Sequence, residues 1–417
     1  MIEALVAAAG AIVVVLAASW IGRRLAALVR QPAVMGEIAV GLLLGPGLLQ
    51  ACGPQVRELL LPRSTLEALH VIGVAGLALY LVGVAHRLGP GLVAYGRKSL
   101  LALTICAVSV PMAIGGGVGF WLLVTDDARL RGDAPAAALV LMFAVSFTVS
   151  AVPVLARIID DRGIAGTRAA RLAMASAIIV DAIGWLLLAV AVGLAGAGLS
   201  GSVRAAVILV VAVAMVPLVR RLLSRPGVTR LCGRSPTTCR MAVAVVAIVA
   251  SWAADNLGLT AVFGAVLIAV SLPPDEDWQR VAGAVSSAGR WLLPIFFATA
   301  GITVWSAADT TFPVMFAVVV TVLAVLGKTA GVLLGARLGG ETGPVRQRLA
   351  VLLNTRGLTE IVLVQAGYSA GIITAPVYLV FVVLALVSTA MTGPLLSLLD
   401  KRRPLVPQDL ATAGGAR

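Results

Sequence analysis

Charged residues are scarce in this chain. They make up 12% of its 417 residues, whereas hydrophobic residues make up 60%, and the mean hydropathy is +1.04. A soluble globular protein of this length cannot bury so much apolar surface, so the composition excludes that class. It indicates an all-α polytopic membrane protein whose surroundings are the lipid bilayer. The length suits one integral membrane bundle without a large soluble domain.

Histidine and cysteine are rarer still, with two and four residues. The cysteines show no metal-ligand spacing, and no histidine lies near Cys232 and Cys239, which share a basic loop. We therefore expect unpaired cysteines, no metal cluster and no cofactor. The sequence also shows no nucleophile–base pair, which argues against an enzyme.

Acidic residues number 19 against 32 lysines and arginines, which gives a net charge of +13. A strongly basic balance is typical of nucleic-acid-binding proteins. Here the basic residues lie in short loops between apolar runs, so we expect no nucleic-acid partner.

Long apolar runs dominate the rest of the sequence. Each is close to the roughly 20 residues that cross a bilayer as a helix, and we expect about thirteen spans. Their expected limits are 4–22, 33–50, 66–86, 99–124, 137–156, 172–195, 204–222, 240–255, 257–273, 285–305, 312–336, 346–368 and 374–398.

The basic residues lie mainly on one side of these spans. If the N-terminus is outside the cell, most of the 32 lysines and arginines fall in cytoplasmic loops. The loop residues on the opposite side are Arg57, Arg63, Arg129, Arg131 and Arg204. Because cytoplasmic loops are enriched in lysine and arginine, we expect a multi-pass protein of the cell (plasma) membrane. Its N-terminus is expected outside and its C-terminus in the cytoplasm.

The chain is expected to form one integral transporter domain over residues 1–400. Its predicted halves are 1–200 and 238–400, joined by a linker helix at about 201–223. Residues 401–417 are rich in proline, glycine and alanine, and we expect a short, disordered cytoplasmic tail there.

A faint internal echo relates the two halves. Gly36–Gly47 in the second span resembles Val262–Pro274 in the ninth, because both are rich in small residues and end at a proline. An odd span between two six-span units gives the units opposite orientations, as in inverted-repeat transporters. We therefore expect inverted six-helix repeats.

One acid, Asp181, lies in the middle of an apolar span, with no other charged residue between Arg171 and Arg204. It is ten residues beyond Arg171, so a helix places it about 15 Å deep, near the midplane of the bilayer. A carboxylate there costs about 2.5–3.5 kcal/mol, and intramembrane acids are functional by default. We predict that Asp181 binds the transported ion.

A base lies at the same predicted depth. Lys328 is nine residues before Arg337, or about 14 Å from the same face. The sequence leaves two roles open for it. Lys328 is the charge partner that keeps Asp181 ionised, or the two form a permanent salt bridge that only holds the bundle together.

The fifth span carries hydroxyls and a proline at this level. Ser146, Thr148 and Ser150 alternate with apolar residues, which does not make one helical face, and Pro153 interrupts helical hydrogen bonding. Interrupted spans are tolerated where the backbone is buried or lines a cavity, and their free carbonyls can ligate a cation. We predict that the three hydroxyl residues help to bind cation and proton, and that Pro153 supports the break. A proline kink without a site is the structural alternative.

The twelfth span is also rich in polar residues. Asn354, Arg356 and Glu360 lie close together within it. Arg356 and Glu360 are four residues apart and can pair on one helix face. We expect these three residues to shape a broken helix rather than to bind substrate.

Six blocks carry a resemblance to a known family: GEIAVGLLLGPGLL, SFTVSAVPVLARIIDDRG, IIVDAIGWLLLAV, FGAVLIAVSLP, LLPIFFATAGI and LLNTRGLTEIVLV. In this order and spacing they are similar to the monovalent cation:proton antiporter-2 family (the sodium/proton exchanger membrane domain), especially its plant cation/proton exchanger branch. The resemblance covers about residues 30–398. It implies a bacterial sodium/proton antiporter-like fold, with about thirteen spans and broken helices crossing at the midplane. It also implies a homodimer in which a core domain moves against a dimerisation domain.

The resemblance assigns roles by position. Asp181 corresponds to the family's ion-binding aspartate, Thr148 and Ser150 to the unwound segment, and Lys328 to the basic residue of the tenth helix. Many members have Asp, Asn or Gln where this chain has Val180, and electrogenic members have two acids. A single acid favours one-for-one exchange and leaves the choice between Na⁺ and K⁺ open.

These features predict a secondary active antiporter that exchanges a monovalent cation for H⁺ by alternating access at Asp181. The alternative is a proton- or cation-coupled carrier of an organic solute on the same fold, for which the spans offer few aromatic or paired polar contacts. A channel would need a continuous polar stripe along the spans, whereas the polar residues are confined to the middle of the membrane. In contrast to many family members, no nucleotide-binding or regulatory domain is expected after Asp400.

Overall fold

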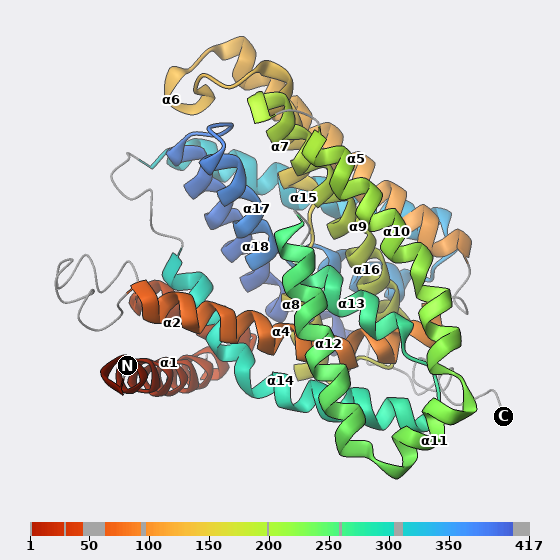
Figure 1. The fold of residues 1–417 in the computed structure, drawn as a ribbon. Coiled ribbons are helices and arrows are strands. Elements are labelled where there is room, and N and C mark those ends of the chain that lie inside the picture. Colours follow the sequence, from red (N-terminus) through yellow and green to blue (C-terminus); the bar gives the residue numbers. More distant parts are fainter. Residues whose placement is uncertain are drawn as a thin grey trace. The chain divides into compact units, whose positions relative to one another are not determined.

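The computed structural model describes residues 2–402 apart from 29–30, 45–62, 93–96, 198–199, 258–260 and 304–311. In this part of the chain every regular element is a helix (Figure 1). Among the described residues, eight helical segments are long and apolar enough to cross a membrane, one of which (Ala136–Asp161) contains a break, and Ala261–Ser271 is a shorter apolar helix. The all-α membrane fold expected from the composition is confirmed.

Helices lie in the described part of each expected span. The fifth and the twelfth are each divided in two by a non-helical segment, as their polar residues predicted. The number of crossings, the orientation and the inverted repeats stay predictions. Residues 403–417 of the expected tail lie outside the described residues.

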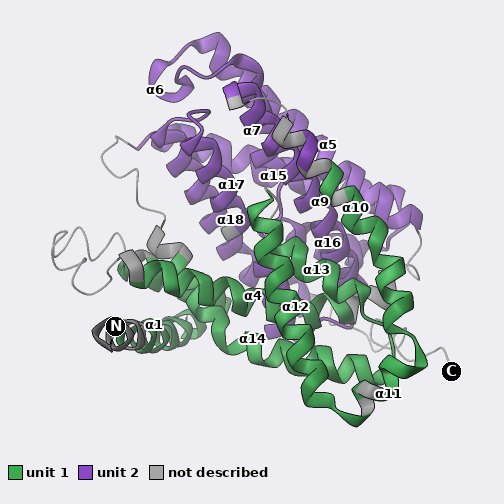
Figure 2. Cartoon of the chain, in the orientation of Figure 1, with its two compact units in different colours: residues 1–90, 205–306 green, residues 91–204, 307–417 purple. Residues whose placement is uncertain are grey.

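The chain divides into two compact units (Figure 2). Unit 1 comprises residues 1–90 and 205–306, and unit 2 comprises residues 91–204 and 307–417. Each unit therefore combines one segment from each predicted half of the sequence.

Unit 1 holds eight helices among its described residues, with most of α10 included. They are α1 (Ile2–Leu28), α2 (Ala33–Leu42), α4 (Arg63–Leu92), α10 (Ser200–Leu223), α11 (Pro226–Arg234), α12 (Pro236–Asn256), α13 (Ala261–Ser271) and α14 (Glu276–Thr303).

Glycines bring two helix pairs of unit 1 into close backbone contact. A Cβ added at Gly36 of α2 would lie 2.1 Å from the carbonyl oxygen of Gly22 in α1. A Cβ at Gly264 of α13 would lie 2.3 Å from the carbonyl carbon of Ala250 in α12. Gly36 and Gly264 lie in the two stretches that resemble each other in the sequence. Each of these glycines permits a close contact with a neighbouring helix.

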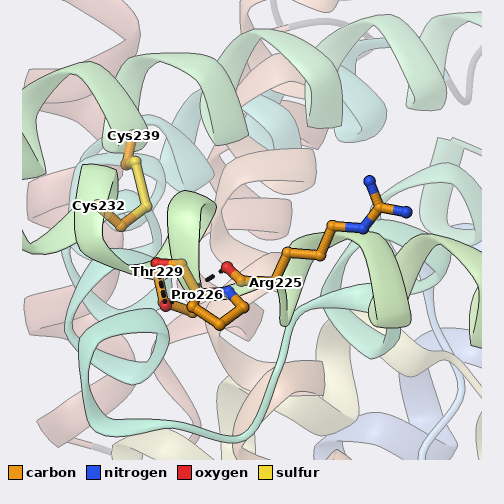
Figure 3. The surroundings of a disulfide bond; sticks show 5 residues. All are labelled: Arg225, Pro226, Thr229, Cys232 and Cys239. Carbon is orange, nitrogen blue, oxygen red and sulfur yellow. Dashed lines mark hydrogen bonds between the residues drawn. A yellow bond between two sulfur atoms is a disulfide. The ribbon is translucent and has the colours of Figure 1, made fainter.

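The basic loop at 222–240 contains a short helix and a disulfide. Cys232 of α11 is bonded to Cys239 of α12, with their Cα atoms 5.5 Å apart (Figure 3). The expectation of unpaired cysteines is wrong for this pair, because the turn at Ser235 folds α11 back onto the start of α12. Cys106 is a free, buried cysteine, and Cys52 lies outside the described residues.

Unit 2 contains the interrupted spans. Its described helices are α5 (Arg97–Thr125), α6 (Ala128–Arg131), α7 (Ala136–Thr148), α8 (Val152–Asp161), α9 (Arg168–Val192) with a π-helical end (Gly193–Ala197), α15 (Val314–Leu338), α16 (Gly343–Leu353), α17 (Leu358–Ser369) and α18 (Ala375–Arg402). Helix α5 packs against both α7 and α15. A Cβ at Gly331 of α15 would lie 2.4 Å from the carbonyl oxygen of Cys106, so α5 and α15 are in close contact.

Candidate functional site

Two helix breaks meet inside unit 2. Helix α7 ends at Thr148, the chain is extended at Val149, and α8 begins at Val152 with Pro153 in its first turn. Proline is favoured there because the first N–H groups of a helix have no partner within it. The backbone N–H of Ala151 in this break donates to the carbonyl of Thr355 in the break between α16 and α17, at 3.1 Å.

Cationic side chains bind the carbonyls at the end of α7. The Arg356 guanidinium donates to the carbonyl oxygens of Ser146 at 2.5 Å and Phe147 at 2.6 Å. The Lys328 ammonium donates to the carbonyl of Thr148 and, at 3.2 Å, to that of Ala107 in α5. The last carbonyls of a helix have no helical partner and carry its negative dipole end, so positive groups stabilise this terminus.

The end of α16 is satisfied in a reciprocal way. The Ser150 hydroxyl, in the α7–α8 break, donates to the carbonyl of Leu353 at 2.8 Å. The Thr389 hydroxyl of α18 donates to the carbonyl of Arg356. Each break thus supplies a donor to the other, which is how non-helical backbone persists among apolar helices.

Asp181 lies on α9 and is fully buried. Neither of its carboxylate oxygens has a hydrogen-bond partner among the described residues. A Cβ at Gly184, one turn further along α9, would lie 2.9 Å from the Val149 side chain, so this face of α9 lies against the α7–α8 break.

The structure decides against one of the two roles that the sequence left open for Lys328, the permanent salt bridge with Asp181. Lys328 donates to backbone carbonyls and forms no salt bridge with Asp181 in this structure. Arg356 and Glu360 do pair, at 2.6 Å, and both side chains are fully buried. The permanent Asp181–Lys328 bridge is therefore absent, whereas the predicted Arg356–Glu360 pair is present.

The predicted hydroxyls of α7 have local partners. Ser146 and Thr148 each donate to the carbonyl four residues earlier, at 2.8 Å. Because these hydroxyls donate to carbonyls, their oxygen lone pairs stay available to a cation or a proton donor.

Asn354 is oriented by two hydrogen bonds at the end of α16. Its amide nitrogen donates to the Thr329 hydroxyl at 2.8 Å and to the Ala350 carbonyl at 3.0 Å. Its amide oxygen has no hydrogen-bond partner among the described residues, and Asn354 is one of the residues that line a cavity of about 150 Å³ between α15, α16 and α18.

Several polar groups of this region were not predicted from the sequence. One is the Thr389 hydroxyl. Two more are the hydroxyls of Thr104 in α5 and Ser176 in α9, which form a hydrogen bond of 3.1 Å. The available signal was weak, because single hydroxyls within apolar spans usually bond to their own helix.

The chain is similar to known proteins of one family. Residues 11–400 match the family model described as "Sodium/hydrogen exchanger, transmembrane". The chain is 28% identical over 377 residues to the Na⁺/H⁺ antiporter NhaS4 of Synechocystis, covering 88% of this chain and 90% of that protein. It is 27% identical over 392 residues to cation/H⁺ antiporter 19 of Arabidopsis thaliana, covering 89% of this chain and 47% of that protein.

The chain is also similar to a yeast protein in sequence and to a solved antiporter structure in fold. The K⁺/H⁺ antiporter 1 of Saccharomyces cerevisiae is 28% identical over 410 residues, covering 92% of this chain and 46% of that protein. The chain thus spans about half the length of the plant and yeast relatives. The sodium proton antiporter MjNhaP1 from Methanocaldococcus jannaschii shares the fold, with a TM-score of 0.64, 16% identity, and coverage of 97% of this chain and 98% of that one. Because the family model matches residues 11–400, which is most of the chain, the chain belongs to the sodium/hydrogen exchanger family of membrane proteins.

Proposed function

We propose that this chain exchanges a monovalent cation for H⁺ by alternating access at Asp181. The observation that carries the proposal is a fully buried carboxylate without a hydrogen-bond partner, on a helix that lies against a break in α7–α8. An ionised carboxylate in such surroundings is costly unless it is paired. Either a bound proton or a bound cation removes that cost, so the two compete for one site.

This competition couples the two ion flows. The site opens alternately to the two sides of the membrane while Asp181 carries a proton or a cation. With Asp181 empty and ionised, this change of access is too costly. Ser146, Thr148 and Ser150 contribute oxygen lone pairs to the dehydrated cation. Lys328 and Arg356 hold the carbonyls of α7 and keep the break in shape. Because one acid serves both ions, the exchange is one-for-one.

Unit 2, which contains Asp181, is the moving core in this proposal. Unit 1 supplies the homodimer contact and stays fixed in the cell membrane, with the N-terminus outside. The similar proteins named for Na⁺/H⁺ and for K⁺/H⁺ exchange support a monovalent cation as substrate and leave both ions as candidates.

The test uses purified protein in liposomes that contain a pH-sensitive dye. Na⁺, K⁺ or Li⁺ is added outside to the wild type, to Asp181→Asn and to the control Asp133→Asn, whose side chain is exposed on the α6–α7 loop. We expect cation-dependent proton movement that is lost in Asp181→Asn and retained in Asp133→Asn. Exchange that survives in Asp181→Asn contradicts the proposal, and proton movement that requires an organic solute instead of a cation favours a solute carrier.

A further inference from the structure

Unit 2 contains an apolar groove that lies outside the predicted ion site. Its volume is about 680 Å³, and residues of α5, α6 and α15 line it. Small-molecule sites commonly measure about 300–1,000 Å³ and are mainly apolar. The floor is formed by Val118, Leu130 and Phe316, each 8% exposed. The mouth is formed by Trp121 and Met315, which are 51% and 77% exposed.

The surface around the mouth is apolar along both long helices. The exposed neighbours of the groove residues include Phe120 and Val124 on α5, and Val318 and Val322 on α15. Helices α5 and α15 are both apolar enough to cross a membrane. Such helices are surrounded by the acyl-chain region of the bilayer. A groove whose lining offers no polar groups to hydrogen-bond a water molecule holds no ordered water.

Along α5 the groove lining runs from Ile114 to Trp121, which are seven residues apart, or about 10 Å along a helix. Ile114, at its inner end, precedes Thr125 at the end of α5 by eleven residues, or about 16 Å along a helix. Near the outer end, Trp121 stacks on Phe316 with ring centroids 6.3 Å apart. Tryptophan is enriched where spans meet the headgroup region. The groove thus runs from that region toward the midplane.

Charges of both signs lie at its polar end. Leu130 is buried in the groove, and its neighbours in α6 are Arg129 and Arg131. Asp126 pairs with Arg131, and the Asp127 side chain accepts from the backbone N–H of Arg129 at 3.0 Å. A rim with both signs complements a zwitterionic headgroup, whose phosphate suits arginine and whose ammonium suits aspartate.

The inner end of the groove touches the residue next to Lys328. A Cβ added at Gly327 would lie 2.7 Å from Cδ1 of Ile114, so α15 contacts the groove lining at this point. Helix α5 also carries Ala107, whose carbonyl accepts a hydrogen bond from Lys328. The spacing of α5 and α15 along the groove therefore bears on the position of the Lys328 ammonium.

We propose that this groove binds one acyl chain of a zwitterionic bilayer phospholipid, and that the bound chain fixes the spacing of α5 and α15 around Lys328. The binding part stands on the groove alone. The effect on exchange rests on the function proposed above.

Gly117 allows the groove to be filled from within. It lines the groove, and a Cβ added there meets no atom within 4 Å. Gly117→Trp therefore places an indole in the groove without a clash at the Cβ. The matched control is Gly283→Trp on α14 in unit 1, because a Cβ at Gly283 also meets nothing within 4 Å. Met315→Trp blocks the exposed mouth and serves if Gly117→Trp does not fold.

The binding test labels purified protein in detergent with phosphatidylcholine that carries a photoreactive diazirine on one acyl chain. We expect saturable labelling of peptides that contain Trp121 and Met315, competed by unlabelled phosphatidylcholine. Labelling at these peptides is lost in Gly117→Trp and in Met315→Trp, and retained in Gly283→Trp. Labelling that does not saturate, or that Gly117→Trp leaves unchanged, overturns the proposal. So does cross-linking of these peptides to a second copy of the chain by a bifunctional reagent.

The exchange test compares the same variants in phosphatidylcholine liposomes. We expect Gly117→Trp to slow cation-dependent proton movement about fivefold or more relative to Gly283→Trp, a size typical of coupling between sites. Unchanged exchange alongside lost labelling overturns the link to Lys328. If the wild type shows no exchange, the proposed function fails, and the labelling result still decides whether the groove binds lipid.

Discussion

At the scale of single residues, Arg356 carries more contacts than its position in the sequence suggests. It pairs with Glu360 at 2.6 Å and donates to two carbonyls at the end of α7. Both side chains of the pair are fully buried. A buried ion pair gains little over an apolar pair of similar volume, but removal of one partner leaves an uncompensated charge.

The consequence is a large asymmetry between single and double substitutions. We expect Arg356→Ala to destabilise the protein by about 3–5 kcal/mol, because Glu360 is left buried and unpaired. The double variant Arg356→Met with Glu360→Met is expected to lose less. Thermal unfolding of purified protein in detergent measures both.

The chain offers an exposed pair as a control. Arg280 and Glu276 are also four residues apart on one helix, but their side chains are 71% and 89% exposed. We expect Arg280→Ala to change stability by less than about 1 kcal/mol. Equal losses for Arg356→Ala and Arg280→Ala would show that burial of the Arg356–Glu360 pair is unimportant.

At the scale of helices, glycine contacts set how closely neighbours approach. Gly264 has the carbonyl carbon of Ala250 only 2.3 Å from where its Cβ would be, and that atom is backbone, so it cannot rotate away. By contrast, Gly283 has open space at the same position.

This difference predicts opposite outcomes for the same substitution. We expect Gly264→Ala to destabilise the protein by about 1–3 kcal/mol through overpacking. Gly283→Ala is expected to be neutral or slightly stabilising, since alanine favours the helix by up to about 1 kcal/mol. Comparison of the two melting temperatures tests the packing of α12 on α13, and a neutral Gly264→Ala would mean that these helices do not approach so closely.

At the scale of the whole molecule, a polar cluster ties together three parts of unit 2. Glu341, in the turn between α15 and α16, is bound by Arg168 at the start of α9 at 2.7 and 2.8 Å. It also accepts a hydrogen bond of 2.5 Å from Ser99 in α5. Burial alone raises the pKa of Glu341, but the hydrogen bonds from Arg168 and Ser99 and the arginine charge outweigh it and lower the pKa below the ordinary value of 4.5.

The lowered pKa makes stability depend on pH. A carboxyl whose pKa is lower in the folded than in the unfolded state contributes stability fully above its unfolded pKa, and this contribution is lost as the pH falls through the folded value. The melting temperature of the wild type should therefore exceed that of Glu341→Gln by a constant amount at neutral pH. The difference should shrink below about pH 4.5. A difference that grows on acidification would contradict the ionised state of Glu341.

The orientation in the membrane is a second property of the whole molecule that can be tested. The distribution of basic residues predicts a cytoplasmic side for Ser224 and an external side for Asp133, and both side chains are exposed. In a cysteine-free background, a membrane-impermeant thiol reagent added to intact cells should label Asp133→Cys and not Ser224→Cys. The reverse pattern would invert the orientation.

Much of the candidate site could be read from the sequence because a bilayer makes polarity conspicuous. Asp181, Lys328 and the polar residues of the broken spans stand out against apolar surroundings, and the cost of burying them marks them as selected features. The helix positions followed from the length of the apolar runs. The membrane class, the helical segments, the two interruptions and the residues on which function is proposed therefore all follow from the amino-acid pattern.

The contacts between these groups, by contrast, depend on the three-dimensional fold. Lys328 binds the carbonyls of Ala107 and Thr148 instead of Asp181, and the Ser150 hydroxyl binds the carbonyl of Leu353. These partners are backbone atoms from distant segments, and a backbone carbonyl leaves no trace in residue identity. The disulfide bond between Cys232 and Cys239 likewise depends on a turn that the spacing of the cysteines in the sequence did not predict. The local sequence pattern shows that a buried polar group requires a hydrogen-bond partner, whereas the fold determines which distant atom is that partner.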